Sequence, residues 1–391
     1  MAGAGARISL CHVLEATAGG TRQHLMDACL GLPPERFRQT AVISTLRDPS
    51  FEADLDSLRE AGVEVEVVQM VREIDRESDL RAYRELKGFF ADHPFDIIHA
   101  HSSKAGMLGR LAAWRSGNRA ARVYSPHAFA FQMDVTRLRR RMFMALERGA
   151  GRITDLLICT CESERDIALR SRIMPPGRAG VVRTGVDLSR FHPQANARRV
   201  REELDLPGRH RIVGAVGALT EQKGHRYLIE AAPLVLERMP HTTFVICGPG
   251  ELEDELRARS NELGIGRRIR FLGHRDDTPR VYAALDLFVL PSLWEGLPYA
   301  LIEAMAVGVP VVGTEITGVT DVIDPGKTGW LTPPADAEGL AETIVAALGQ
   351  EGLSARMAQA AREMVVRGYS RESMLEALQA YYERLMEDRT S

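Results

Sequence analysis

The chain has 391 residues, 45% of them hydrophobic, which is more than one core usually accommodates, so two domains of roughly 200 residues each are expected. A formal net charge of −3 argues against a nucleic-acid-binding protein. The apolar stretches fall short of the roughly 20 residues that span a bilayer, and residues 1–7 do not read as a secretory signal. The sequence therefore predicts a cytoplasmic protein whose membrane contacts, where it has any, are peripheral and at the inner face.

The five cysteines are odd in number and scattered through apolar segments: Cys11, Cys29, Cys159, Cys161 and Cys247. Cys159 and Cys161 form a C-x-C pair without the second pair that would complete a zinc site. We expect buried thiols in a reducing compartment.

Short apolar runs alternate with longer amphipathic segments along the chain. In the first half the runs are residues 8–14, 40–45, 63–68, 97–100, 123–125 and 156–160. After an irregular stretch at 183–196 they are residues 212–216, 243–247, 269–272, 287–290 and 309–312. This alternation predicts two α/β domains, each a Rossmann-like, doubly wound parallel sheet, joined near residue 190 and facing a central cleft. Ligands of such sheets bind outside the carboxyl ends of the strands.

Two motifs follow strands of the first domain. Gly19 and Gly20 lie between the first strand and a helix predicted from about Thr21, where small residues let the backbone approach a phosphate. A glycine pair is also how an ordinary loop turns, and the G-x-G-x-x-G dinucleotide fingerprint is absent from the sequence. His127 lies directly beyond a later strand, a position that favours a role in a site over that of a packed core histidine.

Lys223 lies in the loop 217–224, between a strand and a helix of the second domain. A cation is unfavourable at a helix N-terminus unless an anion is bound there, so this lysine is predicted to meet a phosphate. A fixed ammonium and helix N–H groups can together stabilise the negative charge of a phosphate.

The most informative segment is 287–308, which reads as a buried strand, a loop and an amphipathic helix that begins near Tyr299. Free N–H groups at the helix start favour phosphate or sugar hydroxyls, and the carboxylates of Glu295 and Glu303 can accept hydrogen bonds from hydroxyls. Apolar neighbours on both sides of Glu303 argue against a solvated surface residue. The segment predicts a site for a ligand that is both phosphorylated and polyhydroxylated.

This segment resembles the E-x7-E signature, in its Glu-Gly-Leu-Pro form, of glycosyltransferase family 4, whose members are retaining, nucleotide-sugar-dependent enzymes of the GT-B fold. Further matches, in the order of the family, extend over most of the chain: Gly19-Gly20, 96–101, 125–127, 184–187, 217–224 and 308–312. The resemblance implies an acceptor-side domain at 1–190, a nucleotide-sugar-binding domain at 191–370, and a C-terminal helix at about 371–391 that packs back on the first domain.

The resemblance also implies roles for individual residues. Glu303 would bind the ribose hydroxyls of the nucleotide, and Glu295 would face the transferred sugar. His127 would lie near the reacting sugar and act as a catalytic group together with Glu295 and Lys223. Further donor-binding positions, with the base near residues 273–275, are Gly19, Gly20, Gly273, His274, Arg275, Gly296 and Leu297.

Two positions depart from the family pattern. Ala218 stands where an arginine usually helps to hold the diphosphate, so either Arg22, Arg275 or another cation replaces it, or binding is weaker than usual. Pro298 stands where members often carry glycine, and proline has no N–H to give to a sugar hydroxyl.

The expected reaction is metal-independent, front-face transfer of a hexose-type sugar from a UDP- or GDP-sugar to a hydroxyl acceptor, without a bound cofactor. Asp54 and Asp56 match a D-x-D metal motif, but they fall within a predicted amphipathic helix, and we interpret them as part of its solvated face. Neither nucleic acid nor a metal is an expected partner.

The acceptor is predicted from one segment alone. Residues Arg137–Arg152 combine six arginines with interleaved apolar residues. A basic amphipathic helix can lie on an anionic membrane surface, although it can also pack on its own domain with a basic outer face. The segment favours a lipid-linked glycan, as in polysaccharide assembly, as the acceptor; a soluble molecule such as an inositol derivative stays open.

Two other functions also stay open. A GT-B enzyme such as a nucleotide-sugar 2-epimerase would process the donor without an acceptor. A noncatalytic partner subunit would bind sugar nucleotides without transferring them, an interpretation that only Ala218 supports.

Overall fold

The computed structural model describes residues 7–193 and 197–390. It divides into two compact units, unit 1 with Met1–Arg183 and Glu372–Ser391, and unit 2 with Thr184–Arg371. The first boundary precedes Thr184 instead of lying near residue 190, because backbone hydrogen bonds tie Val186 to the end of unit 2. The Val186 N–H donates to Tyr369 O, and the Arg371 N–H donates to Val186 O, both at 2.9 Å.

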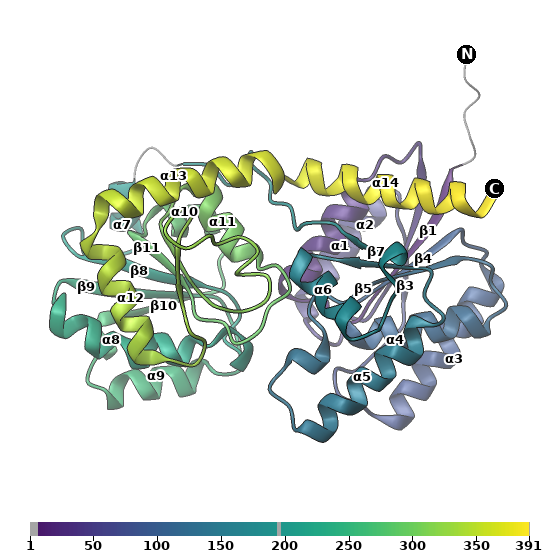
Figure 1. Cartoon of the computed structure of the whole chain (residues 1–391), viewed down its shortest axis with the longest axis horizontal. Coiled ribbons are helices and arrows are strands. Elements are labelled where there is room, and N and C mark those ends of the chain that lie inside the picture. The colour runs from purple at the N-terminus through teal and green to yellow at the C-terminus, as the bar shows by residue number, and fades with distance from the viewer. Residues whose placement is uncertain (1–6, 194–196, 391) are drawn as a thin grey trace, which may run out of the picture. The chain divides into compact units, whose positions relative to one another are not determined.

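The described residues of unit 1 form a seven-stranded parallel sheet in the order β3-β2-β1-β4-β5-β6-β7, with helices on both faces (Figure 1). Its strands are β1 Ile8–Leu14, β2 Phe37–Ile43, β3 Glu64–Val67, β4 Ile97–His101, β5 Ala121–Ser125, β6 Leu156–Cys159 and β7 Ala179–Val181. Its helices are α1 Gly19–Gly31, α2 Glu52–Glu60, α3 Arg76–Asp92, α4 Ser103–Arg115, α5 Arg137–Gly151, α6 Glu162–Arg170 and α14 Arg371–Thr390. Strand β7 was not expected, because three residues that include a glycine carry too little pattern to predict a strand.

The C-terminal helix α14 packs on the sheet of unit 1. Its Leu378 and Tyr382 are fully buried and share an apolar core with Leu10 of β1. Helix α1 packs closely against α14 because Gly31 has no side chain; a Cβ at that position would collide with Leu375. The last helix of the chain therefore completes the core of the first unit.

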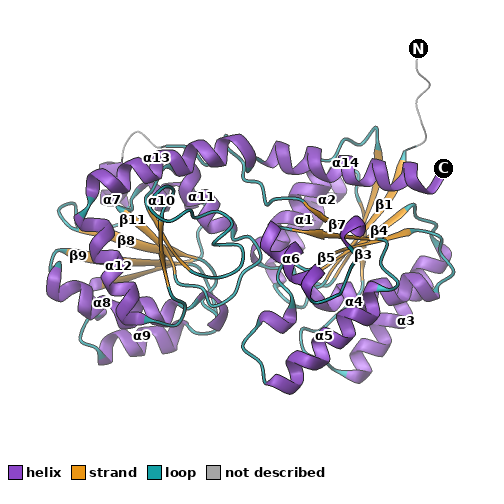
Figure 2. Cartoon of the chain, in the orientation of Figure 1, coloured by secondary structure: helices purple, strands orange, loops and turns teal. Residues whose placement is uncertain are grey.

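The described residues of unit 2 form a six-stranded parallel sheet in the order β10-β9-β8-β11-β12-β13, again covered by helices (Figure 2). Its strands are β8 Arg211–Val216, β9 Thr242–Cys247, β10 Ile269–Gly273, β11 Leu287–Leu290, β12 Val311–Thr314 and β13 Trp330–Thr332. Its helices are α7 Ala197–Glu203, α8 His225–Arg238, α9 Glu253–Glu262, α10 Thr278–Ala283, α11 Tyr299–Val307, α12 Ala337–Gly349 and α13 Glu351–Gly368. The two sheets confirm the predicted pair of Rossmann-like α/β domains.

Helix α11 begins at Tyr299 as expected, but the prediction of an amphipathic helix is wrong. Its side chains are buried from Leu301 to Val307 with the exception of the half-buried Glu303. The helix contacts β11 and β12 on one side and α13 on the other, so it has no broad solvent-facing stripe.

The five cysteines all lie in the described residues, and each is free and buried, as expected. In the ranges 7–193 and 197–390, no helix has the length and apolar character needed to cross a bilayer.

A buried ion pair anchors α5 to the rest of unit 1. The Arg110 guanidinium of α4 donates to Glu147 Oε2 of α5 at 3.0 Å, with side chains 1% and 6% exposed. Tyr124 Oη donates to Glu147 Oε1 at 2.8 Å, and the guanidinium carbon lies 3.7 Å from the centre of the Tyr124 ring. Burial, followed by the Glu147 charge, raises the pKa of Tyr124 well above its ordinary value, so the phenol stays a donor.

Replacing Arg110 with methionine leaves the Glu147 charge buried without its cation. We expect the free energy of unfolding, measured by urea denaturation, to fall by about 3–5 kcal/mol. Arg59→Met, which breaks an exposed pair with Asp56, should lower it by less than about 1 kcal/mol. Equal effects of the two substitutions would show that the buried pair does not stabilise unit 1.

Candidate active site

In unit 2, the loop after β8 brings Lys223 to the loop after β11. The loop contains a short 3-10 helix, Glu221–Lys223, and turns at Gly224, whose φ is +62°. Glycine is needed there for its left-handed backbone and because a Cβ would collide with Pro291 O. Helix α8 begins at the next residue, so Lys223 lies at a helix start, as the sequence predicts.

The Lys223 ammonium forms an ion pair with Glu295. Lys223 Nζ donates to Glu295 Oε1 at 2.6 Å, and the two side chains are 20% and 6% exposed. Ser292 Oγ donates to the same oxygen at 2.8 Å, and Gln222 Nε2 donates to Glu295 Oε2 at 3.3 Å. The sequence predicts a phosphate as the partner of Lys223 and a sugar as the partner of Glu295, whereas the structure pairs the two residues and gives the carboxylate three hydrogen-bond donors.

Glu303 lies on α11, at the carboxyl-end side of the strands, and is held by a tyrosine of α10. Tyr282 Oη donates to Glu303 Oε2 at 2.7 Å. Tyr282 is fully buried, and burial followed by the Glu303 charge raises the pKa of its phenol well above the ordinary value. The phenol therefore stays protonated and orients a half-buried carboxylate, which is not an ordinary solvated helix residue.

The other predicted donor positions of unit 2 lie at strand ends. Gly273 ends β10 with a φ of +63°, and His274 beyond it is exposed. Gly296 and Leu297 lie between β11 and α11, and Gly296 O lies so close to Gly318 that a Cβ on Gly318 would collide with it. Leu297 is buried.

Neither cation suggested as a replacement for the missing arginine at Ala218 is unpaired. Arg275 donates two hydrogen bonds to Asp277, at 2.7 and 2.8 Å. In unit 1, Arg22 donates to Asp54 at 2.6 Å and also pairs with Asp48. Asp54, part of the D-x-D sequence, is thus an ion-pair partner on α2.

In unit 1, helix α1 begins at Gly19, two residues earlier than expected, so the predicted glycines Gly19 and Gly20 form its first turn. Gly19 has a φ of +58°, which disfavours larger residues. Apart from its chain neighbours and the backbone of its own helix, no described residue has an atom within 4 Å of where a Cβ on Gly19 would be. The helix start is therefore open beside its backbone.

His127 lies on a strained turn after β5. Its φ is +52°, and that of Ala128 is +94°, a conformation that non-glycine residues rarely adopt. The turn is held by Glu164 of α6, which is fully buried and accepts the Ala128 N–H at 2.8 Å. The same carboxylate accepts the Thr160 N–H at 2.7 Å. The hydrogen bonds to Glu164 hold the turn in its strained conformation and thereby position the half-buried His127 ring.

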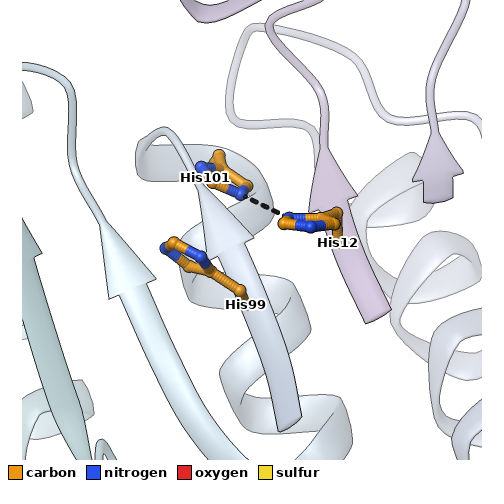
Figure 3. Close-up of side chains that lie close together, drawn as sticks. All are labelled: His12, His99 and His101. Atoms are coloured by element: carbon orange, nitrogen blue, oxygen red, sulfur yellow. Dashed lines mark hydrogen bonds between the residues drawn. The ribbon is translucent and has the colours of Figure 1, made fainter. Parts of the chain in front are cut away.

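Five histidines gather around this turn, and we call them the histidine cluster: His12, His24, His99, His101 and His127. A hydrogen-bonded chain runs through three of them. His127 Nε2 lies 3.1 Å from His101 Nδ1. His101 Nε2 lies 3.1 Å from His12 Nδ1, the bond that Figure 3 marks with a dashed line. His99 is bonded on both sides, to Tyr382 Oη at 2.6 Å and to Ser125 Oγ at 2.9 Å.

The cluster is neutral at pH 7. Burial lowers the pKa of His12 to about 3 and that of His24 to about 4. Burial also places the pKa values of His99, His101 and His127 well below the ordinary value. The sequence singles out His127 and gives less weight to its neighbours; polar residues at alternate positions of the buried strand β4 are the signal that could have found the rest.

Two family models match the chain. The model described as "Glycosyl transferases group 1" matches residues 196–364, and the model described as "Glycosyl transferase 4-like domain" matches residues 19–185. Each match falls almost wholly within one of the two units.

Among curated proteins, the chain is 30% identical over 370 residues to UDP-Gal:alpha-D-GlcNAc-diphosphoundecaprenol alpha-1,3-galactosyltransferase of Escherichia coli, covering 93% of this chain and 94% of that protein. It is 29% identical to D-inositol 3-phosphate glycosyltransferase of Corynebacterium jeikeium, with 74% and 73% of the two chains covered. Among solved structures, HepE of Anabaena in complex with UDP and glucose superposes with a TM-score of 0.81 at 21% identity, over 97% of this chain and 100% of that one. The chain therefore belongs to the group 1 glycosyl transferases and has their GT-B fold.

Proposed function

We propose that this glycosyltransferase moves a hexose-type sugar from UDP- or GDP-sugar to a hydroxyl acceptor with retention of configuration and without a metal. The observation that carries the proposal is the pair of anchored carboxylates in unit 2, Glu295 with its ammonium partner and Glu303 with its phenol partner. The partly exposed Lys223 ammonium suits a phosphate, and the oriented carboxylate oxygens of Glu295 and Glu303 suit hydroxyl groups. HepE of Anabaena, which is similar in fold, forms a complex with UDP and glucose.

Some of the proposed donor contacts contribute to the affinity for the nucleotide, and others contribute to the rate of sugar transfer. Lys223 meets the diphosphate and stabilises its growing charge as the sugar leaves, while Glu303 accepts hydrogen bonds from ribose hydroxyls. The backbone of Gly19 and the residues Gly273, His274, Arg275, Gly296 and Leu297 complete the donor contacts. His127 and Glu295 act on the sugar.

Front-face attack is supported by the surroundings of Glu295. Three donors stabilise its negative charge, and a carboxylate stabilised in this way is a poor nucleophile. The departing phosphate oxygen would then take the proton of the acceptor hydroxyl, so that no single side chain serves as an indispensable base.

The acceptor proposed is a lipid-linked glycan, reached by contact of α5 with an anionic membrane. Leu138, Met142 and Leu146 are 79%, 40% and 44% exposed, and they lie on one side of the helix with Ala145 and Gly149. Exposed arginines flank this stripe: Arg137, Arg139, Arg141, Arg148 and Arg152. The Escherichia coli relative is named for a diphosphoundecaprenol-linked acceptor, and α5 favours this class over the inositol phosphate named for the Corynebacterium relative.

The reaction is tested by incubating EDTA-treated protein with UDP-, GDP- and ADP-sugars, with and without a membrane lipid extract. We expect UDP or GDP release that the extract stimulates, and an α-linked product from an α-linked donor. A β-linked product would contradict retention. Conversion of the donor without nucleotide release would favour the 2-epimerase, and tight donor binding with neither reaction would favour the noncatalytic partner.

The two glutamates should separate binding from transfer. Glu303→Gln removes a charged acceptor of ribose hydroxyls, and we expect nucleotide affinity, measured by calorimetry, to fall about tenfold or more. Glu295→Gln should lower kcat by about a hundredfold while affinity changes by less than about threefold. A covalent sugar trapped on the enzyme, or rescue of Glu295→Ala by azide, would instead identify Glu295 as a nucleophile.

Membrane contact is tested by cosedimentation with phosphatidylglycerol vesicles. Replacing Leu138 and Met142 with glutamate puts negative charge into the apolar stripe, and we expect vesicle binding to fall at least about tenfold. The control is Val366→Glu on α13, where the valine is 45% exposed. If the protein with glutamate at positions 138 and 142 and the Val366→Glu control both bind vesicles as well as the wild type, α5 is ruled out as the membrane contact.

A further inference from the structure

Three members of the histidine cluster lie close enough to share one metal ion. His24 comes from α1, His101 from β4 and His127 from the turn after β5. One ring nitrogen of each lies within 4.8 Å of one ring nitrogen of each other residue. The rings lie close together: the centroids of His24 and His127 are 4.8 Å apart with the rings edge to face, and those of His101 and His127 are 5.4 Å apart with the rings stacked.

The distances suit a tetrahedral site. With metal–nitrogen bonds of about 2.0–2.1 Å, two ligand nitrogens of a tetrahedral zinc site lie about 3.3 Å apart. His101 Nδ1 and His127 Nε2 are already 3.1 Å apart. The ligand nitrogen of His24 lies within 4.8 Å of the other two, so the His24 ring must move toward them to complete the site. Three neutral imidazoles leave a fourth position for water or a substrate oxygen.

The protonation pattern also suits a metal ligand. His101 Nε2 is hydrogen-bonded to His12 Nδ1 at 3.1 Å. When His101 donates this bond, its lone pair is at Nδ1, the nitrogen that faces His127. Histidines that bind metals are held in this way, with the second ring nitrogen donated to a neighbouring acceptor.

A second trio, His12, His99 and His101, is equally compact but less suitable. Both nitrogens of His99 are already hydrogen-bonded, to Tyr382 and to Ser125. In contrast, the buried Nδ1 of His24 has no hydrogen-bond partner among the described residues, and His24 is 3% exposed. His127 is half-buried, so an ion can enter beside it.

We propose that His24, His101 and His127 bind a zinc-class ion, and that the bound ion inhibits sugar transfer. On binding, the ion replaces the hydrogen bond between His127 Nε2 and His101 Nδ1. The proton of that bond moves from Nε2 to Nδ1 of the His127 ring, so that the Nε2 lone pair can bind the metal. His127 is then held by the metal and is withdrawn from the sugar. The binding stands on the geometry alone, whereas the inhibition rests on the proposed role of His127.

Binding is tested on the full chain, stripped with EDTA and dialysed, by titration with Co²⁺. We expect one equivalent to bind with the visible absorption of a tetrahedral nitrogen site, and Zn²⁺ to displace it. His24→Asn should weaken Co²⁺ binding at least about thirtyfold, whereas His93→Asn, at an exposed histidine of the same unit, should leave it unchanged. The absence of tetrahedral absorption would overturn the proposal, as would binding that His12→Asn abolishes and His24→Asn does not.

Inhibition is measured as the ratio of transfer rates without and with Zn²⁺. We expect this ratio to exceed ten for the wild type and to approach one for His24→Asn. Equal ratios in the two proteins would overturn the inhibitory role. Because Co²⁺ absorption does not depend on turnover, a protein that binds the ion but transfers no sugar would refute the proposed function and leave the metal site supported.

Discussion

The parallel register of β1, β4 and β5 is the constraint on which the first unit depends. His12 pairs with His99, and His101 pairs with Ser125. Paired residues of neighbouring strands point to the same face, so the register alone puts these polar side chains side by side. A shift of one residue in β4 would turn its two histidines to the opposite face and put Ile98 and Ala100 in their place. The hydrogen-bonded chain to His127 exists only in the observed register.

The second unit uses the same principle with different chemistry. Its strands end at one edge of the sheet, and the loops beyond β8 and β11 meet there, where Lys223 finds Glu295. Each carboxylate is held by a residue from another element: Lys223 of the loop after β8 pairs with Glu295, and Tyr282 of α10 donates to Glu303. An oriented carboxylate loses little entropy when a hydroxyl binds, so the scaffold contributes to affinity before any ligand arrives.

The fold could be predicted from local patterns, but the hydrogen-bond partners of the candidate site residues could not. The apolar runs predict the strands and the two units, and the segment around Glu295 indicates the family. The partner of Glu303 is Tyr282, which lies 21 residues earlier and is invisible to any periodicity. The histidine chain joins residues up to 89 positions apart, so only the sheet order reveals it. Helix α11 was mistaken for an amphipathic helix because α13, which covers it, follows much later in the chain.

The return of α14 to the first unit determines the order in which the protein can be completed during synthesis. The ribosome releases Met1–Arg183 and then all of unit 2 before the helix that carries Tyr382 emerges. Until then the face of the sheet around Leu10 lacks the cover that α14 provides, and His99 lacks the phenol that holds it. The second unit can fold as a continuous segment, whereas the first waits until α14 has been synthesised, an interval in which aggregation competes with folding.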